Sequence, residues 1–166
     1  MKLTLIGPIY PYRGGIAHFT TTLAKKLTES GHEIQVISFK KQYPQWLYPG
    51  KSDKDFSANR EHVDVEYLLA PLNPFTWQKT VTSILNYQPQ IVIIPWWVTF
   101  WSLAFHHIIN RLKKYGIIST FLVHNTLPHE ARTIDRTLAR WALNQADKFI
   151  VMTEKEKVRL LDLLPT

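Results

Sequence analysis

Residues 91–123 read IVIIPWWVTFWSLAFHHIINRLKKYGIISTFLV. The segment begins with a continuous apolar run, Ile91 to Ile94, which is typical of a parallel strand covered on both faces. Residues 98–115 then predict an apolar helix that ends in basic residues, and such charges suit a helix C-terminus. Residues 117–123 form a second apolar run. Strand, helix and strand in this order predict a parallel sheet of the α/β class.

The rest of the chain repeats this alternation. Strands are predicted at 2–6, 33–39, 63–69 and 148–152, and helices at 16–30, 74–87, 130–145 and after Thr153, where Glu156 has the spacing of a capping box. The helix at 130–145 is expected to bury a stripe made of Ala131, Ile134, Leu138, Trp141 and Ala142. A long polar and aromatic loop fills 40–62. We therefore predict one Rossmann-like domain over 1–166, an open parallel sheet with helices on both faces.

Composition narrows the possible functions. The 166 residues contain no cysteine, which excludes disulfides, thiolate metal sites and thiol catalysis and fits a cytoplasmic location. The formal net charge is +7, which favours anionic partners. No nucleic-acid-binding motif accompanies this charge, so we expect no nucleic acid partner. No apolar stretch reaches the ~20 residues of a membrane-spanning helix.

The loop after the first strand is the first candidate site, because ligands of open α/β sheets bind beyond the carboxyl ends of the strands. Gly14 and Gly15 allow close approach of a ligand, and the following helix N-terminus with Arg13 favours an anion. The alternative is a simple turn before a helix. The Gly-x-Gly-x-x-Gly pattern is absent, so a nicotinamide cofactor is not expected.

The histidines and arginines offer further candidates. His124 and His129 lack a third ligand in their loop, so no metal site is predicted. His18 is expected to face either a cleft or the core, and His106 and His107 to be packing or surface residues. A helical face formed by Arg132, Arg136 and Arg140 is either solvated or docks to acidic lipid, with Trp46, Tyr48, Trp96 and Trp97 as added aromatic contacts.

Three segments together resemble the glycosyltransferase family 4 pattern. They are Pro11 to His18 with Gly31 to Val36, then Phe121 to Asn125 with Pro128 to Glu130, and finally Gln145 to Met152. The resemblance spans nearly the whole chain in the family's order. It implies the N-terminal, acceptor-side half of a GT-B enzyme that moves a sugar from a nucleotide-sugar donor, with retention of configuration, to a glycan or lipid-linked acceptor.

The resemblance also implies roles for individual residues. The amides of Gly14 and Gly15, with Arg13, would hold the donor diphosphate, and His124 would contact the transferred sugar as the catalytic residue. Many members have His-Asp where this chain has His124-Asn125, so no acidic role is carried over. Further contacts to acceptor or sugar are expected from His18, Asn125, His129 and Glu130. No cofactor is implied.

The second domain of such enzymes carries the nucleotide pocket and a Glu-x7-Glu motif. No two glutamates of this chain have that spacing. A C-terminal domain or a partner chain is therefore expected to complete the enzyme, and the fragment alone is expected to be inactive. The alternative is a non-catalytic binding or membrane-docking subunit that recruits a catalytic partner, peripheral on the cytoplasmic membrane.

Overall fold

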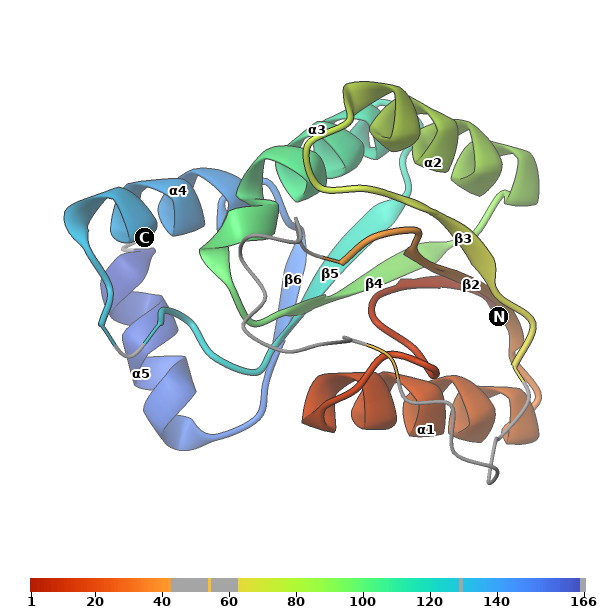
Figure 1. The fold of residues 1–166 in the computed structure, drawn as a ribbon, viewed down its shortest axis with the longest axis horizontal. Helices are drawn as coiled ribbons and strands as arrows, with labels where there is room; N and C mark the ends of the chain where they lie inside the picture. Colours follow the sequence, from red (N-terminus) through yellow and green to blue (C-terminus); the bar gives the residue numbers. More distant parts are fainter. Residues whose placement is uncertain (43–53, 55–62, 129, 165–166) are drawn as a thin grey trace. The chain divides into compact units, whose positions relative to one another are not determined.

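A computed structural model describes residues 1–42, 54, 63–128 and 130–164. The chain divides into two compact units, Met1–Gln90 and Ile91–Thr166. Figure 1 labels the helices and strands of both units. Within each unit the strands pair in parallel, which confirms the predicted α/β class.

The first unit contains β1 (Lys2–Ile6), α1 (Gly15–Glu29), β2 (Glu33–Phe39), β3 (Glu66–Leu69) and α2 (Pro74–Tyr87). Its strands lie in the order β3-β2-β1, with Ile6 opposite Ile37 and Ile37 opposite Glu66. The neighbouring residues Gln35 and Val36 point to opposite sides of β2. Gln35 bonds Ser83 of α2, whereas Val36 lies beside Ala24 of α1, so the two helices cover opposite faces of these strands (Figure 1).

Small residues bring α1 close to its strands. Ala17, Thr20, Thr21 and Ala24 are the buried residues of α1, whereas the larger apolar residues that define its helical spacing are half-buried. The other helix of this unit begins at Pro74, and the side chain of Asn73 accepts a hydrogen bond from the Phe75 amide (3.1 Å). Asn before Pro is a favoured helix start, which is why the sequence predicts this boundary well.

The second unit contains β4 (Ile91–Trp96), a 3-10 turn η2 (Thr99–Trp101), α3 (Ser102–Lys113), β5 (Ile118–Val123), α4 (Thr133–Leu143), β6 (Lys148–Val151) and α5 (Glu154–Leu163). Its strands lie in the order β4-β5-β6, and Trp96, Val123 and Val151 are level with one another. The carboxyl ends of the three strands therefore meet at one edge.

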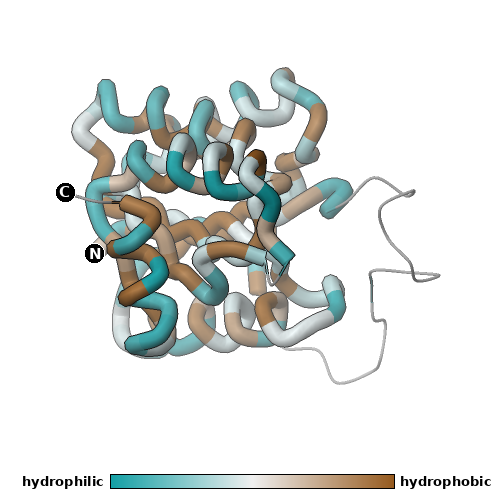
Figure 2. Tube along the Cα trace, turned by 90° about the vertical axis from the view of Figure 1, so that its left-hand side faces the viewer, coloured by the Kyte–Doolittle hydropathy of each residue, from teal (hydrophilic) through white to brown (hydrophobic). Residues whose placement is uncertain are grey.

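An aromatic cluster forms the core of the second unit. Phe121 of β5 lies between Trp96, Phe105 and Phe149, with ring centroids 5.5, 6.2 and 6.4 Å away. Trp96, Trp101, Phe105 and Phe121 are at most 1% exposed. Figure 2 shows hydrophobic residues along the strands and alternating polar and apolar residues along the helices, as expected for helices covering a sheet.

Most predicted elements are confirmed, with shifted ends. The third strand starts only at Glu66, the fourth continues through Pro95 to Trp96, and the predicted helix at 98–115 divides into η2 and α3. The helix predicted at 130–145 spans only Thr133–Leu143. The predicted loop at 40–62, including Trp46 and Tyr48, lies mostly outside the described residues. Lys54 is described and forms an antiparallel bridge with Tyr12.

Candidate functional site

The glycine loop after β1 is anchored through its tyrosines. The Tyr12 hydroxyl donates to the Phe39 carbonyl at the end of β2 (2.6 Å), and its ring is 2% exposed. The Tyr10 amide donates to Thr21 Oγ1 of α1 (3.1 Å), and its carbonyl accepts from Tyr67 Oη (3.1 Å). These bonds fix the loop to β2, β3 and α1, just before its exposed tip.

That exposed tip is formed by Arg13, Gly14 and Gly15. Gly14 has φ 108° and ψ 164°, a conformation that a side chain disfavours. Gly15 starts α1, and a Cβ placed on it would meet nothing within 4 Å. Among the described residues no side chain caps α1, and its first turn holds no acidic residue, so the orphan amides of its first turn face no carboxylate of their own.

His18 is exposed on the first turn of α1, and its amide donates to the Gly14 carbonyl (3.1 Å). The interpretation of His18 as a core residue is therefore wrong. It lies on the same helix end as Arg13, Gly14 and Gly15, and these four candidates are together in the first unit.

His124 follows β5 directly, at the edge where the second unit's strands end. Its amide donates to the Trp96 carbonyl of β4 (2.9 Å), continuing the pairing by one residue beyond the strand. The side chain is half-buried, and burial lowers the pKa of His124 below its ordinary value. The neutral imidazole is therefore the form that this position favours at neutral pH, with one donor and one acceptor nitrogen.

The residues after His124 form a tightly held loop. Asn125 is exposed, whereas Thr126 is fully buried. The Thr126 amide donates to Glu156 Oε2 of α5 (2.6 Å), and the Trp96 indole donates to the Thr126 carbonyl (3.1 Å). Side chains from β4 and α5 thus fix the backbone two residues beyond His124.

Glu156 departs from its predicted role. Thr153 caps α5 as expected, since its hydroxyl accepts from the Glu156 amide (3.2 Å). The Glu156 carboxylate, however, bonds Thr126 and Arg159 instead of completing a capping box. A sequence pattern shows spacing along one helix, and it carries no sign of a loop thirty residues earlier that offers a buried amide.

The other candidates on the β5–α4 segment have separate surroundings. Glu130 is exposed, and His129 lies outside the described residues. The Arg132 amide donates to Asp135 Oδ2 (2.9 Å) at the start of α4, and Arg140 Nε donates to the Leu163 carbonyl of α5 (2.9 Å). Of the arginine face, Arg140 is thus partly engaged in joining α4 to α5.

The buried stripe predicted for the helix at 130–145 is wrong at three of its five positions. Ile134 is 64% and Trp141 41% exposed, and Ala131 before the helix is exposed too, whereas Ala139, Ala142 and Leu143 form the buried side. Trp141 instead lies flat on the ring of His106 from α3, with centroids 3.5 Å apart and planes 5° apart. Alanines allow α4 to pack closely, so the larger side chains are turned outward. Trp96 is wrongly predicted as an interfacial aromatic residue, because it is fully buried.

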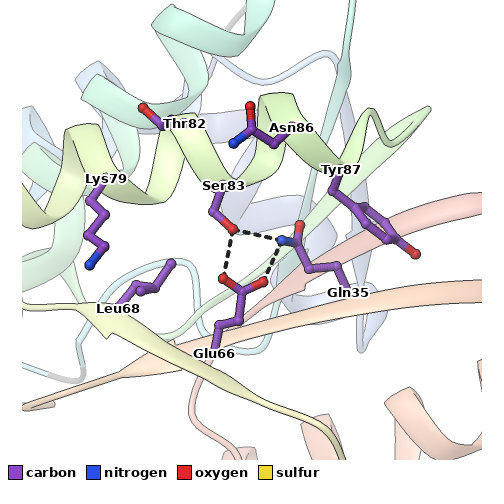
Figure 3. A pocket seen from close by; sticks show the side chains of 8 residues that line it. All are labelled: Gln35, Glu66, Leu68, Lys79, Thr82, Ser83, Asn86 and Tyr87. Carbon is purple, nitrogen blue, oxygen red and sulfur yellow. Dashed lines mark hydrogen bonds between the residues drawn. The ribbon is translucent and has the colours of Figure 1, made fainter.

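The grooves described in the first unit lie away from these loops. One has a volume of about 470 Å³ and lies between α2 and the strands β2 and β3 (Figure 3). There Glu66 accepts from Gln35 Nε2 (2.7 Å) and Ser83 Oγ (2.8 Å), so these three side chains are bonded to one another. The second groove lies beside α1 and is lined by Lys25, Thr28 and His32 among others. Neither includes Arg13, Gly14, Gly15 or His18.

Within the described residues, no three His, Asp or Glu side chains come together in a way that could hold a metal ion, and none of the helices has the length and apolar character of a membrane span. Sequence reasoning misses Tyr12, Thr126 and Glu156 as positioning residues, although a tyrosine within a Pro- and Gly-rich loop is a usable signal for an anchor. The remaining candidates fall into two groups, Arg13 to His18 in the first unit and His124 to Glu130 in the second.

Comparison with known proteins identifies the family. No curated protein sequence matches the chain. Two structures of an alpha-glucosyltransferase are similar in fold, one in complex with UDP-glucose and DNA containing an abasic site and one in complex with UDP. Each has 13% sequence identity and a TM-score of 0.60, and each match covers 99% of this chain and 39% of the other. The chain therefore spans about two fifths of these GT-B enzymes, and at this identity the likeness shows the fold. The profile of Glycosyltransferase Family 4 matches residues 13–165, so the chain belongs to Glycosyltransferase Family 4.

Proposed function

We propose that the chain is the acceptor-side part of a retaining transferase that moves a sugar from a nucleotide-sugar donor to a glycan or lipid-linked acceptor. The observation that carries this proposal is the His124 loop. It presents a half-buried imidazole, of lowered pKa, from a loop that neighbouring elements hold in place. A preorganised neutral donor stabilises charge that develops on a sugar hydroxyl or leaving oxygen during transfer.

The glycine tip would hold the donor diphosphate. Helix N-terminal amides and the helix dipole favour an anion, and each contact contributes ~0.3–1 kcal/mol when exposed. Several amides together with Arg13 would therefore be needed for useful affinity. The open space around Gly15 and the positive φ of Gly14 support this role, because they leave the amides accessible.

A second domain would supply the nucleotide pocket. The chain spans about two fifths of the enzymes that it resembles in fold. Catalysis depends on groups assembled around the transition state, so the complete transferase is the right subject for an activity assay.

The glycine tip can be tested in the complete transferase with Gly15→Val. The side chain fits the folded chain, since nothing lies within 4 Å of its Cβ, but it would block a diphosphate from the amides. We expect the donor KM to rise roughly tenfold or more, about 1.4 kcal/mol of lost binding, with little change in melting temperature. Lys25→Val is the matched control, a β-branched residue at an exposed position near the other end of α1. An unchanged KM in Gly15→Val would remove the diphosphate from this site.

A second candidate function, docking to an acidic membrane from the cytoplasmic side, is favoured by the outer surface of α3 and α4. Residues 102–115 and 132–143 carry six Lys and Arg and one acidic residue, Asp135, which bonds Thr99 and Arg132. Leu103, Ile134 and Trp141 of these helices are 41–64% exposed, and Tyr115, just after α3, is 65% exposed. We call these exposed basic and apolar residues the α3–α4 face.

This combination suits a lipid headgroup region. Exposed aliphatic and aromatic side chains insert at the interface, and each basic residue near an anionic surface adds ~1 kcal/mol. A binding or docking subunit of this kind could recruit a catalytic partner without catalysing transfer itself.

Vesicle sedimentation tests the α3–α4 face. The chain is expected to bind vesicles containing phosphatidylserine, to release at high salt and to ignore neutral vesicles. The double variant Ile134→Ser with Trp141→Ser should lose binding. Val158→Ser with Leu161→Ser, two exposed aliphatic residues of α5, is the matched control and should bind normally. Equal loss in both variants, or no binding by the parent chain, would exclude docking through this face.

A further inference from the structure

Glu156 is a buried carboxylate, only 6% exposed, near the start of α5. Burying a charged group is costly unless hydrogen bonds and opposite charge compensate. Burial by itself would raise the pKa of Glu156, but the hydrogen bonds from Thr126 and the Arg159 guanidinium outweigh it and the pKa is lowered. The carboxylate is therefore charged at neutral pH and strongly held.

The two carboxylate oxygens have different partners. Oε1 accepts from Arg159 Nη1 (2.7 Å), which lies one turn later on the same helix. Oε2 accepts from the Thr126 amide (2.6 Å), which belongs to the loop after β5. One oxygen is thus used within α5, and the other leaves the helix to bind a distant backbone amide.

Each polar group of Thr126 forms a hydrogen bond. Its hydroxyl donates to the Glu156 carbonyl (3.2 Å), and its own carbonyl accepts from the Trp96 indole (3.1 Å). With the amide bonded to Oε2, no part of its backbone is left to water, consistent with its complete burial. The helix α5 and the strand β4 therefore clamp this residue between them.

The backbone of this loop is fixed at two positions, His124 itself and Thr126. The His124 amide is bonded to the Trp96 carbonyl, and Thr126 is clamped two residues later. A loop backbone fixed at both positions holds the Cα of His124 in place, and the half-buried imidazole extends from it. Such support is what a residue needs in order to meet a reacting group with constant geometry.

We propose that Glu156 is a positioning residue that fixes the orientation and burial of His124 through the Thr126 amide. The proposal rests on the proposed function only for the catalytic role of His124. The clamp itself is a property of the folded chain. It acts through a hydrogen bond to a charged acceptor, which is stronger than one between neutral groups.

The test measures the clamp directly in the 166-residue chain. Hydrogen exchange followed by NMR reports the protection of the Thr126 amide, and the His124 ring signals as a function of pH report its burial. In Glu156→Ala we expect Thr126 protection to fall about tenfold or more, as for loss of a hydrogen bond to a charged group. The pKa of His124 should rise toward its ordinary value as the loop loosens.

Three further variants separate positioning from general stability. Glu154→Ala removes an exposed carboxylate from the first turn of the same helix and pairs only with Lys157 among the described contacts, so Thr126 and His124 should be unchanged. Arg159→Ala removes the partner of Oε1 and should leave Thr126 protected. Glu156→Gln keeps one acceptor oxygen, should fold if the alanine variant does not, and should restore part of the protection.

The outcomes are distinct. Loss of protection confined to Thr126 and its neighbours, with a shifted His124 titration, supports the proposal. A uniform loss of protection over the whole unit, or an unchanged His124 titration in Glu156→Ala, would overturn it. If the clamp is confirmed while the complete transferase tolerates loss of His124, the proposed function fails and the positioning role of Glu156 remains.

Discussion

At the scale of single residues, His124 combines two properties that suit a reacting group. Its side chain is half-buried, which disfavours the charged form, and its backbone is bonded to a neighbouring strand. A residue of this kind contributes little to the apolar core, so its removal should affect chemistry more than folding.

Replacing His124 by Ala in the complete transferase should lower kcat by roughly a hundredfold, the range seen when one preorganised donor is removed. The free energy of unfolding should change by no more than ~1 kcal/mol. Transfer assays and thermal melts of the same preparation measure both. His106→Ala is the control, since His106 lies in α3 and stacks on Trp141. A parallel fall of stability and activity would make His124 a structural residue.

The sequence predicts the exposed members of the candidate site better than their supports. Composition identifies Arg13, Gly14 and Gly15, which lie in a loop rich in Pro and Gly. Position identifies His124, which follows an apolar strand. Tyr12, Thr126 and Glu156 do not, because each acts through a partner at least 27 residues away. Periodicity and spacing describe neighbours along the chain, whereas these bonds depend on where the fold brings distant backbone groups.

At the scale of elements, the Asp147 side chain fixes the position of one strand end against its neighbour. It precedes β6, and its Oδ2 accepts from both the amide and the hydroxyl of Ser119 at the start of β5 (2.8 Å each). Its own amide donates to the Ser119 carbonyl (3.0 Å). Burial works against the charged form, but these hydrogen bonds outweigh it and lower the pKa of Asp147. These contacts tie the start of β6 to the start of β5.

Asp147→Ala should lower the free energy of unfolding by ~1–2 kcal/mol, since two hydrogen bonds to a charged acceptor are lost. Asp147→Asn, which keeps one acceptor oxygen, should lose less. Urea denaturation followed by circular dichroism measures both variants against Asp162→Ala, an exposed acidic residue on α5. If all three variants changed the free energy of unfolding equally, the contact of Asp147 with Ser119 would contribute nothing specific to stability.

The elements themselves are well predicted where one physical signal dominates. Apolar runs identify all six described strands, and Asn73-Pro74 identifies the start of α2. The error in α4 has a different origin. Ile134 and Trp141 have the spacing of a buried stripe, but alanines on the adjacent side allow closer packing, so the more apolar residues are exposed. Hydrophobicity alone does not show which side of a helix fits its neighbour best.

At the scale of the whole molecule, the lowered pKa values of several groups act in one direction with pH. His107 and His124 have pKa values lowered mainly by burial, so the unfolded chain binds protons more readily below about pH 6.5. Asp135 and Glu156 also have lowered pKa values, so their contribution is present above about pH 4.5 and is lost as the pH falls further.

The melting temperature should therefore fall from pH 7 to pH 3 in two steps, the first below about pH 6.5 and the second below about pH 4.5. Calorimetry across this range at constant ionic strength measures it. The double variant His107→Gln with His124→Gln should lose the upper step and keep the lower one. A melting temperature that rose on acidification through pH 6 would contradict the sign.

The 166-residue chain on its own should bind nucleotide sugars weakly, with Kd values above the micromolar range, and should catalyse no transfer. The reason is that the proposed nucleotide pocket belongs to a second domain. Titration calorimetry with UDP-glucose and ADP-glucose measures this, with the complete transferase as the positive control. Micromolar or tighter binding by the chain alone would place the nucleotide pocket within it.

The stack of Trp141 on His106 also gives the chain a built-in optical probe. The two rings lie 3.5 Å apart on the outer surface of α3 and α4, whereas Trp96 and Trp101 are fully buried in the core. Trp141 is 41% exposed, so the emission of its indole depends on the polarity of its surroundings. A partner that covers this surface should therefore change the wavelength and intensity of tryptophan emission, so its binding can be followed without a label.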